Sequence, residues 1–148
     1  MTEQKQFCTF YINKHMFGVK VEQVQEVFRY QEMTTVPLAP PEVRGLINLR
    51  GQIITAIDLR LRLGMEPGPE DKLPMNVVVR TKDGVVSLLV DEIGDVLEVA
   101  DDVYERPPET IPQEVRNLVL GVYKLEGKLL LILDSEKAVN VSTDTIAT

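Results

Sequence analysis

Two stretches of this sequence resemble each other closely: GLINLRGQIITAID at residues 45–58 and GVYKLEGKLLLILD at residues 121–134. They align without a gap, from Gly45 on Gly121 to Asp58 on Asp134, and in each a glycine separates two short apolar runs. Short apolar runs closed by turn residues are typical of the hairpins of a β-sandwich or β-barrel. The pair of stretches therefore predicts one hairpin in each half of the chain.

The matched positions of these stretches indicate the local geometry. Gly51 matches Gly127, and a repeated glycine fits a turn that needs a positive φ. Asp58 matches Asp134, and each aspartate precedes a short segment with helical potential. A carboxylate in that position fits an N-cap, because its oxygen can accept a hydrogen bond from a free amide of the first turn.

A second repeat, with a constant offset of its own, lies upstream of the first. Its matched pairs are Cys8/Val77, Phe10/Val79, Phe17/Val86, Val21/Val90, Val24/Ile93 and Val27/Val96. Each half thus contains a hairpin, a V-x-x-V-x-x-V-type segment, a proline-containing loop and a second hairpin. Since short strands need closure to hide their edges, we predict one domain over residues 1–148 with two barrel-like halves, at about residues 6–66 and 74–140. An exchange of strands between the halves would leave no mark in the sequence.

Composition excludes several classes of protein. With 148 residues, 44% of them hydrophobic and 26% charged, the chain has the make-up of one globular domain. A formal net charge of −7 repels phosphate backbones, so we expect no nucleic-acid partner. No apolar run approaches the ~20 residues of a membrane span, and we expect no signal peptide before the first strand. With Cys8 as the only cysteine, a reducing cytoplasm is the expected setting.

The residues that catalysis requires are scarce. The only histidine is His15, at an expected hairpin turn where a solvated side chain is the ordinary interpretation. One histidine and one cysteine cannot form the usual His/Cys zinc clusters, and no phosphate-binding glycine loop occurs. The acidic residues after position 90 lack the spacing of a calcium loop and fit solvated carboxylates. We therefore expect no enzyme, metal site or cofactor.

The V-x-x-V-x-x-V-type segments are the first candidate for binding. Their spacing puts the apolar residues on one face of a predicted helix. Such a stripe is usually part of a core; alternatively, the two stripes line a groove that receives an apolar helix of a partner. The stripes are Val21, Val24, Val27 and Phe28 in the first half and Val90, Ile93, Val96 and Leu97 in the second.

The second candidate is Arg50, where the two halves differ. The first half has NLRG at residues 48–51, and the second has KLEG at residues 124–127. Arg50 places a planar guanidinium at a tight turn, where it could bind a partner's carboxylate through two hydrogen bonds. The alternative is a solvated turn arginine.

A series of motifs runs through the chain in a fixed order. They are VQEV at residues 24–27, P-x-x-P-x-x-V-x-GLINLRG at 37–51, II-x-x-IDLR at 53–60, VDEI-x-DV at 90–96 and LILD-x-EK at 131–137. In this order and spacing the sequence resembles the CheW family of chemotaxis coupling proteins, over nearly the whole chain.

The resemblance implies a mainly β fold of two intertwined, SH3-like five-stranded β-barrels with short helices. It also implies a non-catalytic cytoplasmic adaptor, recruited to membrane-associated receptor arrays, that couples the hairpin tips of methyl-accepting chemoreceptors to the regulatory domain of the chemotaxis histidine kinase. Two alternatives stay open: a coupling protein of a pilus, gliding or other chemosensory pathway, and a fragment of the kinase's own regulatory domain. An enzyme with a barrel fold is the least favoured alternative.

The resemblance also implies site residues. Receptor contact falls on Val24, Glu26, Val27, Asn48, Arg50, Ile93 and Val96, and kinase contact falls near the strand that begins with Met75, Asn76 and Val77.

Overall fold

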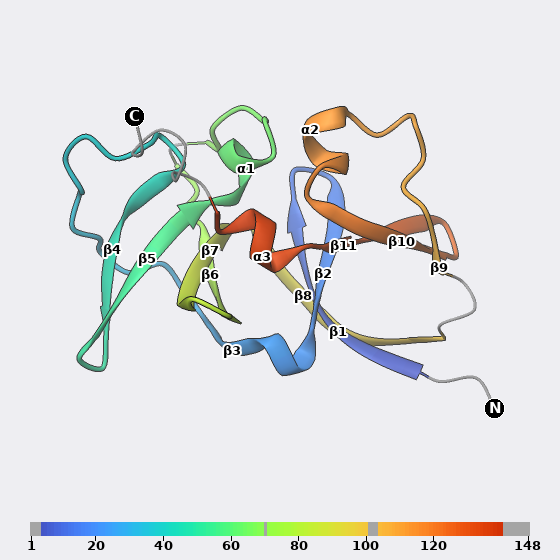
Figure 1. The fold of residues 1–148 in the computed structure, drawn as a ribbon, viewed down its shortest axis with the longest axis horizontal. Coiled ribbons are helices and arrows are strands. Elements are labelled where there is room, and N and C mark those ends of the chain that lie inside the picture. Colours follow the sequence, from blue (N-terminus) through green and yellow to red (C-terminus); the bar gives the residue numbers. More distant parts are fainter. Residues whose placement is uncertain (1–3, 70, 101–103, 141–148) are drawn as a thin grey trace.

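The computed structural model describes residues 4–69, 71–100 and 104–140, which form two β-sheets side by side (Figure 1). The elements are β1 (Gln4–Ile12), β2 (His15–Lys20), η1 (Val21–Gln23), β3 (Val24–Phe28), β4 (Val43–Leu49), β5 (Gln52–Asp58), α1 (Leu59–Arg62), β6 (Met75–Thr81), β7 (Gly84–Val90), β8 (Glu92–Ala100), β9 (Tyr104–Glu105), α2 (Gln113–Arg116), β10 (Val119–Leu125), β11 (Lys128–Leu133) and α3 (Ser135–Ala138). The expected mainly β fold with short helices is confirmed.

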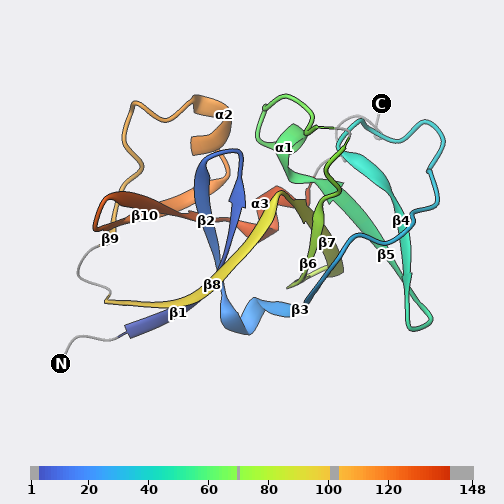
Figure 2. The same cartoon turned by 180° about the vertical axis from the view of Figure 1, so that it is seen from behind.

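Each sheet combines strands from both halves of the sequence. Sheet A has the order β8-β1-β2-β11-β10-β9, and sheet B has the order β3-β6-β7-β5-β4. The first hairpin of the chain, β1–β2, therefore lies with β8, β10 and β11, and Figure 2 shows the yellow strand β8 beside this blue hairpin. Hairpin β6–β7 lies with β3, β4 and β5 instead. The chain crosses between the sheets twice, after β2 and after β7, so the two sheets are intertwined. Sheet B has the five strands expected of each half, but sheet A has six, because the two-residue strand β9 pairs with β10.

The repeat in the sequence is also a repeat of strand register. Strand β5 runs parallel to β7 with Thr55 opposite Val86, and β11 runs parallel to β2 with Leu131 opposite Phe17. Thr55 and Leu131 are a matched pair of the first repeat, and Phe17 and Val86 are a matched pair of the second. Matched residues thus occupy equivalent positions in the two sheets.

Buried side chains fall into a central core between the sheets, one smaller cluster inside sheet A and two smaller clusters inside sheet B. Along β6, Val77 and Val79 lie in the central core, whereas Val78 points into the interior of sheet B. Along β11, Leu131 is central and Leu130 lies inside sheet A. Because both faces of these strands are buried, the apolar runs are continuous instead of alternating.

The predicted turns and caps are present. Gly51 and Gly127 have φ values of 88° and 77°, where a side chain would be strained. Asp58 and Asp134 each accept a hydrogen bond from the backbone amide three residues further on, at 3.3 and 3.2 Å. These carboxylates cap α1 and α3 as the sequence predicts.

The prediction of helical stripes is wrong. Residues 24–28 and 92–100 are edge strands, β3 and β8, and only the single 3-10 turn η1 precedes β3. An isolated helix of two turns is marginal in water, because nucleation is costly. The neighbouring strands β6 and β1 instead offer backbone partners, which valine-rich segments use well. Among the helices in the described ranges, none is long and apolar enough to cross a membrane.

Candidate functional site

The strand geometry divides each apolar stripe between the core and the surface. Val24 and Ile93 are half-buried and pack against the central core. Val27 and Val96 occupy equivalent positions three residues further on and are 39% and 57% exposed. The register of β3 and of β8 shifts by one residue between these positions, so a β-bulge interrupts the simple alternation of the strand there. Of the stripe residues, only Val27 and Val96 are exposed and present substantial apolar surface to a partner.

Arg50 lies at the tip of the β4–β5 hairpin in an unfavourable backbone conformation. Its φ is 50° and that of Gly51 is 88°, so both turn residues are left-handed, as in a type I′ turn. This conformation costs a residue with a Cβ roughly 1–2 kcal/mol, and asparagine or glycine is preferred there. The Oδ1 atom of Asn48 accepts a hydrogen bond from the Gly51 amide at 2.9 Å, which stabilises the turn. Asn48 thus has a structural role and remains exposed.

The guanidinium of Arg50 forms an ion pair with Glu26, another residue predicted to contact the receptor. Glu26 lies on β3, at the opposite end of the sheet order from β4. A backbone bridge between Thr34, in the segment after β3, and Leu46 of β4, at 2.8 and 2.9 Å, also draws these two margins of sheet B together. The Arg50 side chain is still 71% exposed, which leaves donors for a partner.

Ile53 is an exposed apolar residue that the sequence reasoning missed. It lies opposite Asn48 in the β4–β5 pair and is 60% exposed. The segment from Ile53 to Ile57 is mostly apolar and reads as a buried strand, although its first residue lies near the hairpin tip. The alternation of a strand could have placed Ile53, given the burial of Ile54.

The three residues predicted near the kinase contact differ in accessibility. Met75 is half-buried, but Asn76 and Val77 are 0% and 1% exposed. Asn76 accepts a hydrogen bond from the hydroxyl of Ser87 at 2.7 Å and donates one to the carbonyl of Arg29 at 3.2 Å. Strand β6 lies between β3 and β7 and has no free edge. In this fold, only Met75 of the three offers its side chain to a partner.

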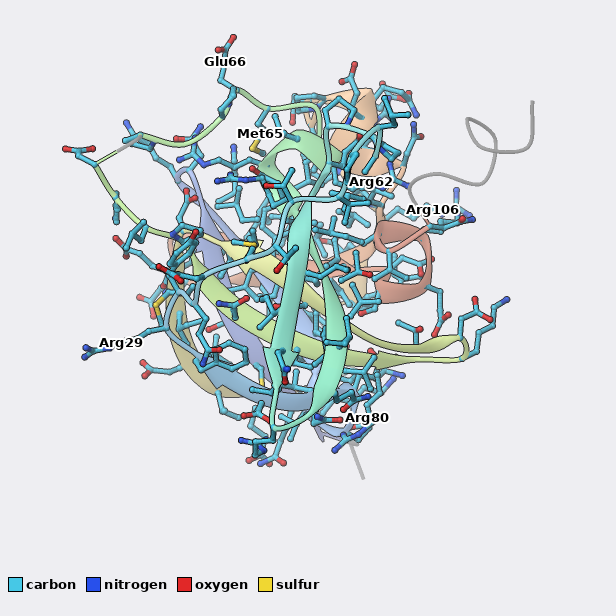
Figure 3. The ribbon with its side chains drawn as sticks, turned by 90° about the vertical axis from the view of Figure 1, so that its left-hand side faces the viewer. Arg29, Arg62, Met65, Glu66, Arg80 and Arg106 are labelled. Atoms are coloured by element: carbon cyan, nitrogen blue, oxygen red, sulfur yellow. The ribbon has the colours of Figure 1, made fainter. Side chains whose placement is uncertain are left out.

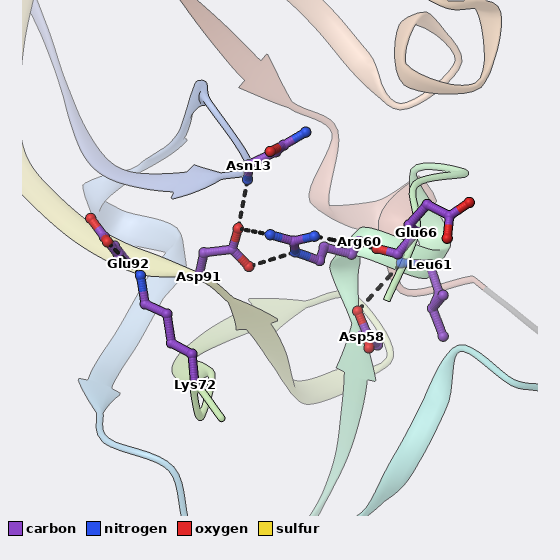
Figure 4. Close-up of polar contacts among 8 residues, drawn as sticks. All are labelled: Asn13, Asp58, Arg60, Leu61, Glu66, Lys72, Asp91 and Glu92. Atoms are coloured by element: carbon purple, nitrogen blue, oxygen red, sulfur yellow. Dashed lines mark hydrogen bonds and ion pairs between the residues drawn. The ribbon is translucent and has the colours of Figure 1, made fainter. Parts of the chain in front are cut away.

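Asp91 connects three elements at the second crossover between the sheets. Its carboxylate accepts hydrogen bonds from Nε and Nη2 of Arg60 in α1, at 2.8 and 2.7 Å (Figure 4). It also accepts one from the backbone amide of Asn13, in the β1–β2 turn, at 2.6 Å. Burial raises the pKa of Asp91, but the bonds from Arg60 and Asn13 outweigh burial and hold that pKa below its ordinary value. The hydrogen bonding between Arg60 and Asp91 also raises the pKa of Arg60.

Two further arginines, one in β6 and one in α1, brace the intertwined chain. Arg80 in β6 donates to the carbonyls of Glu22 and Val24, at 3.2 and 3.3 Å, where the chain first crosses between the sheets. Arg62 in α1 donates to carbonyls at the end of α3, the closest at 2.8 Å on Lys137. Figure 3 shows Arg62 beside α3 and Arg80 at the rim of sheet B. Both side chains thereby help to hold the halves together.

The acidic residues do not form a metal site among residues 4–69, 71–100 and 104–140, where no group of three or more His, Cys, Asp or Glu side chains could hold a metal ion. Asp101 and Asp102 lie outside the described residues. His15 is exposed at the start of β2. Cys8 is half-buried, and burial raises the pKa of its thiol, which disfavours the reactive thiolate.

Comparisons with known proteins agree on one family. The CheW-like domain matches residues 6–142. A probable chemotaxis protein CheW of Rhizobium etli is 30% identical over 132 residues, which cover 89% of this chain and 85% of that protein. The crystal structure of the scaffolding protein TtCheW from Thermoanaerobacter tengcongensis superposes with a TM-score of 0.83 at 27% identity, and the match covers 95% of each chain. Protein PilI of Pseudomonas aeruginosa is a more distant relative, 26% identical over 82% of this chain and 68% of PilI.

Proposed function

The chain belongs to the CheW family, and we propose that it joins chemoreceptors to the histidine kinase of a chemosensory signalling complex. Its role is that of a non-catalytic coupling and scaffolding protein of chemotaxis. The observation that carries this conclusion is the family match over residues 6–142, together with the superposition on a scaffolding protein over 95% of the chain. The proposed location is the cytoplasm, at membrane-associated receptor arrays.

We assign the receptor contact to the exposed part of the predicted residue set. Val27 and Val96 supply aliphatic surface on the outer strands β3 and β8, which suits the apolar side of a helical receptor tip. Arg50 supplies free guanidinium donors at the hairpin tip. A receptor carboxylate could exchange with Glu26 there, since an exposed ion pair contributes little stability and is readily replaced. Val24 and Ile93 support this surface from the core.

The strained turn favours recognition over a passive role for Arg50. A left-handed turn position disfavours arginine, so the residue carries a backbone cost that its side chain must offset. The kinase contact rests on the resemblance alone, and Met75 is the accessible residue of the set predicted for it.

The proposal is tested by affinity capture from the cytoplasm of the source organism with the full chain as bait. Recovery of chemoreceptors together with a chemotaxis histidine kinase is the expected result. Arg50→Ala should weaken binding of a receptor fragment by about tenfold or more, which corresponds to the lower end of the roughly 1.5–3 kcal/mol of a hydrogen bond to a charged group. Glu126→Ala, at the equivalent turn of the second half, is the matched control and should bind normally.

The similarity to PilI makes a different chemosensory pathway the second candidate. The same capture separates the two, because the receptors and kinase that co-purify identify the pathway. Capture of neither class of protein by the folded chain would contradict both proposals.

A further inference from the structure

A cleft of about 600 Å³ lies beside the second crossover, between the β1–β2 turn of sheet A and the margin of sheet B. Its apolar wall includes Tyr11 and Tyr30, and the linker between the halves adds Pro67, Pro69 and Pro74. Small-molecule sites commonly have volumes of roughly 300–1,000 Å³ and combine such walls with a few polar groups. The cleft is thus of a suitable size and character for a small organic molecule.

The cleft is cationic in a chain of net charge −7, and the internal repeat shows that these cations are particular to it. The cleft residues Lys14, Arg44 and Arg60 correspond, through the two offsets of the repeat, to Asp83, Leu120 and Glu136. Lys72 adds a fourth cation. It belongs to the linker between the two halves, which has no counterpart in the repeat. The two barrels share their fold but not this concentration of positive charge.

Not every cation of the cleft is free to bind a ligand. Arg60 is fully engaged with Asp91, and Lys72 pairs with Glu92 at 2.7 Å (Figure 4). Arg44 uses one nitrogen on Asp58, at 3.1 Å, and its side chain is 45% exposed.

Lys14 is exposed and has no ion pair within the part of the chain that the structure describes. In all, four cationic side chains line the cleft, against the three carboxylates of Asp58, Asp91 and Glu92. Its unused donors are the ammonium of Lys14 and the remaining guanidinium nitrogens of Arg44.

We propose that this cleft binds a small organic anion, a carboxylate or a phosphate monoester with a flat apolar body. The anionic group binds Lys14 and Arg44, and the body packs against Tyr11 and Tyr30. Lys14 belongs to the β1–β2 turn of sheet A and Arg44 to β4 of sheet B, so the ligand connects the two barrels. This inference is independent of the receptor and kinase contacts proposed above.

The test is a titration of the isotope-labelled full chain, followed through its amide resonances. The probes are phenyl phosphate and benzoate, with phenol as the uncharged control and inorganic phosphate as the control without an apolar body. At least one aromatic anion should bind tenfold or more tightly than both controls, with shifts at the cleft residues. The tighter of the two identifies the anionic group. Aromatic anions that bind no better than phenol and inorganic phosphate would overturn the proposal.

Two variants separate a built site from general charge attraction. Lys14→Asp introduces the residue type that Asp83 supplies at the equivalent turn, and it should lower the affinity for the tighter-binding probe at least tenfold. Lys82→Asp makes the same change of net charge in the β6–β7 turn, away from the cleft, and should leave the affinity unchanged within twofold. Both lysines lie in surface turns, so both variants should fold, and circular dichroism checks that they do. Equal effects of the two substitutions would refute the assignment.

Discussion

Replacing Asp91 by asparagine should destabilise the junction between the barrels by about 2–3 kcal/mol. The substitution keeps the shape of the side chain and one acceptor, but it removes the charge that Arg60 contacts through two hydrogen bonds. Removing one partner of a fully buried ion pair costs roughly 3–5 kcal/mol. Both side chains here are 17% exposed, so water compensates for part of the loss and the smaller figure is expected.

The assay is urea unfolding followed by circular dichroism, supported by a thermal melt. For a chain of this size, a loss of about 2–3 kcal/mol corresponds to a melting temperature lower by about 5–10 °C. A double-mutant cycle with Arg60→Ala isolates the pair, and the coupling should exceed ~1 kcal/mol. Glu92→Gln is the matched control, since it removes a carboxylate from an exposed pair in the same cleft and should leave the midpoint unchanged.

The same pair predicts a pH dependence with a definite sign. The pKa of Asp91 is lowered in the folded chain, so its contribution is complete above the ordinary aspartate pKa of about 3.9. The contribution disappears as the pH falls through the lower, folded-state value. The difference in the free energy of unfolding between wild type and Asp91→Asn should therefore be constant between about pH 5 and 8, and it should shrink as the pH falls below about 4. A variant whose free energy of unfolding at neutral pH stays within ~0.5 kcal/mol of wild type, as for an ordinary surface substitution, would refute this account of the junction.

Three further predictions concern single positions. Val24→Asp should lower the free energy of unfolding by more than ~2 kcal/mol, because it buries a charge against the central core. Val27→Asp, at an exposed position, should leave that free energy within ~0.5 kcal/mol of wild type. Similar losses for both variants in urea unfolding would contradict the division of the stripe. Arg50→Gly should keep or raise the melting temperature by relieving the left-handed turn, yet weaken receptor binding, and a large drop would mean that Arg50 holds the barrel closed. Gly121→Ala would place a methyl group against the ring of Tyr104, so the exposed ring should swing away. Hydrogen exchange at β9 should then accelerate without global unfolding, and unchanged exchange would argue against this contact.

Features that depend on a few neighbouring residues could be predicted from the sequence. The turns at Gly51 and Gly127 need only a residue that tolerates a positive φ, and the caps at Asp58 and Asp134 need only a carboxylate three residues before a free amide. The internal repeat and the ordered motifs were enough to indicate the family and the mainly β fold. Arg50 also stood out, because its counterpart in the repeat is an acid.

Features that depend on which segments meet were decided only by the tertiary structure. The apolar pattern of β1–β2 suits either barrel equally well, so the pattern could not say that this hairpin joins the strands of the other half. The valine-rich segments fit a helical stripe by spacing, and they became edge strands because β6 and β1 offered backbone partners. Asn76 lost its predicted accessibility because its side chain lies on the inner face of β6, like Val78, and bonds to Ser87 and to the carbonyl of Arg29. The contact of Arg60 with Asp91, and the cationic cleft beside it, join residues that lie far apart in the sequence. Local residue types determine turns and caps, but the choice among equally apolar strand partners is made by closure of the whole barrel.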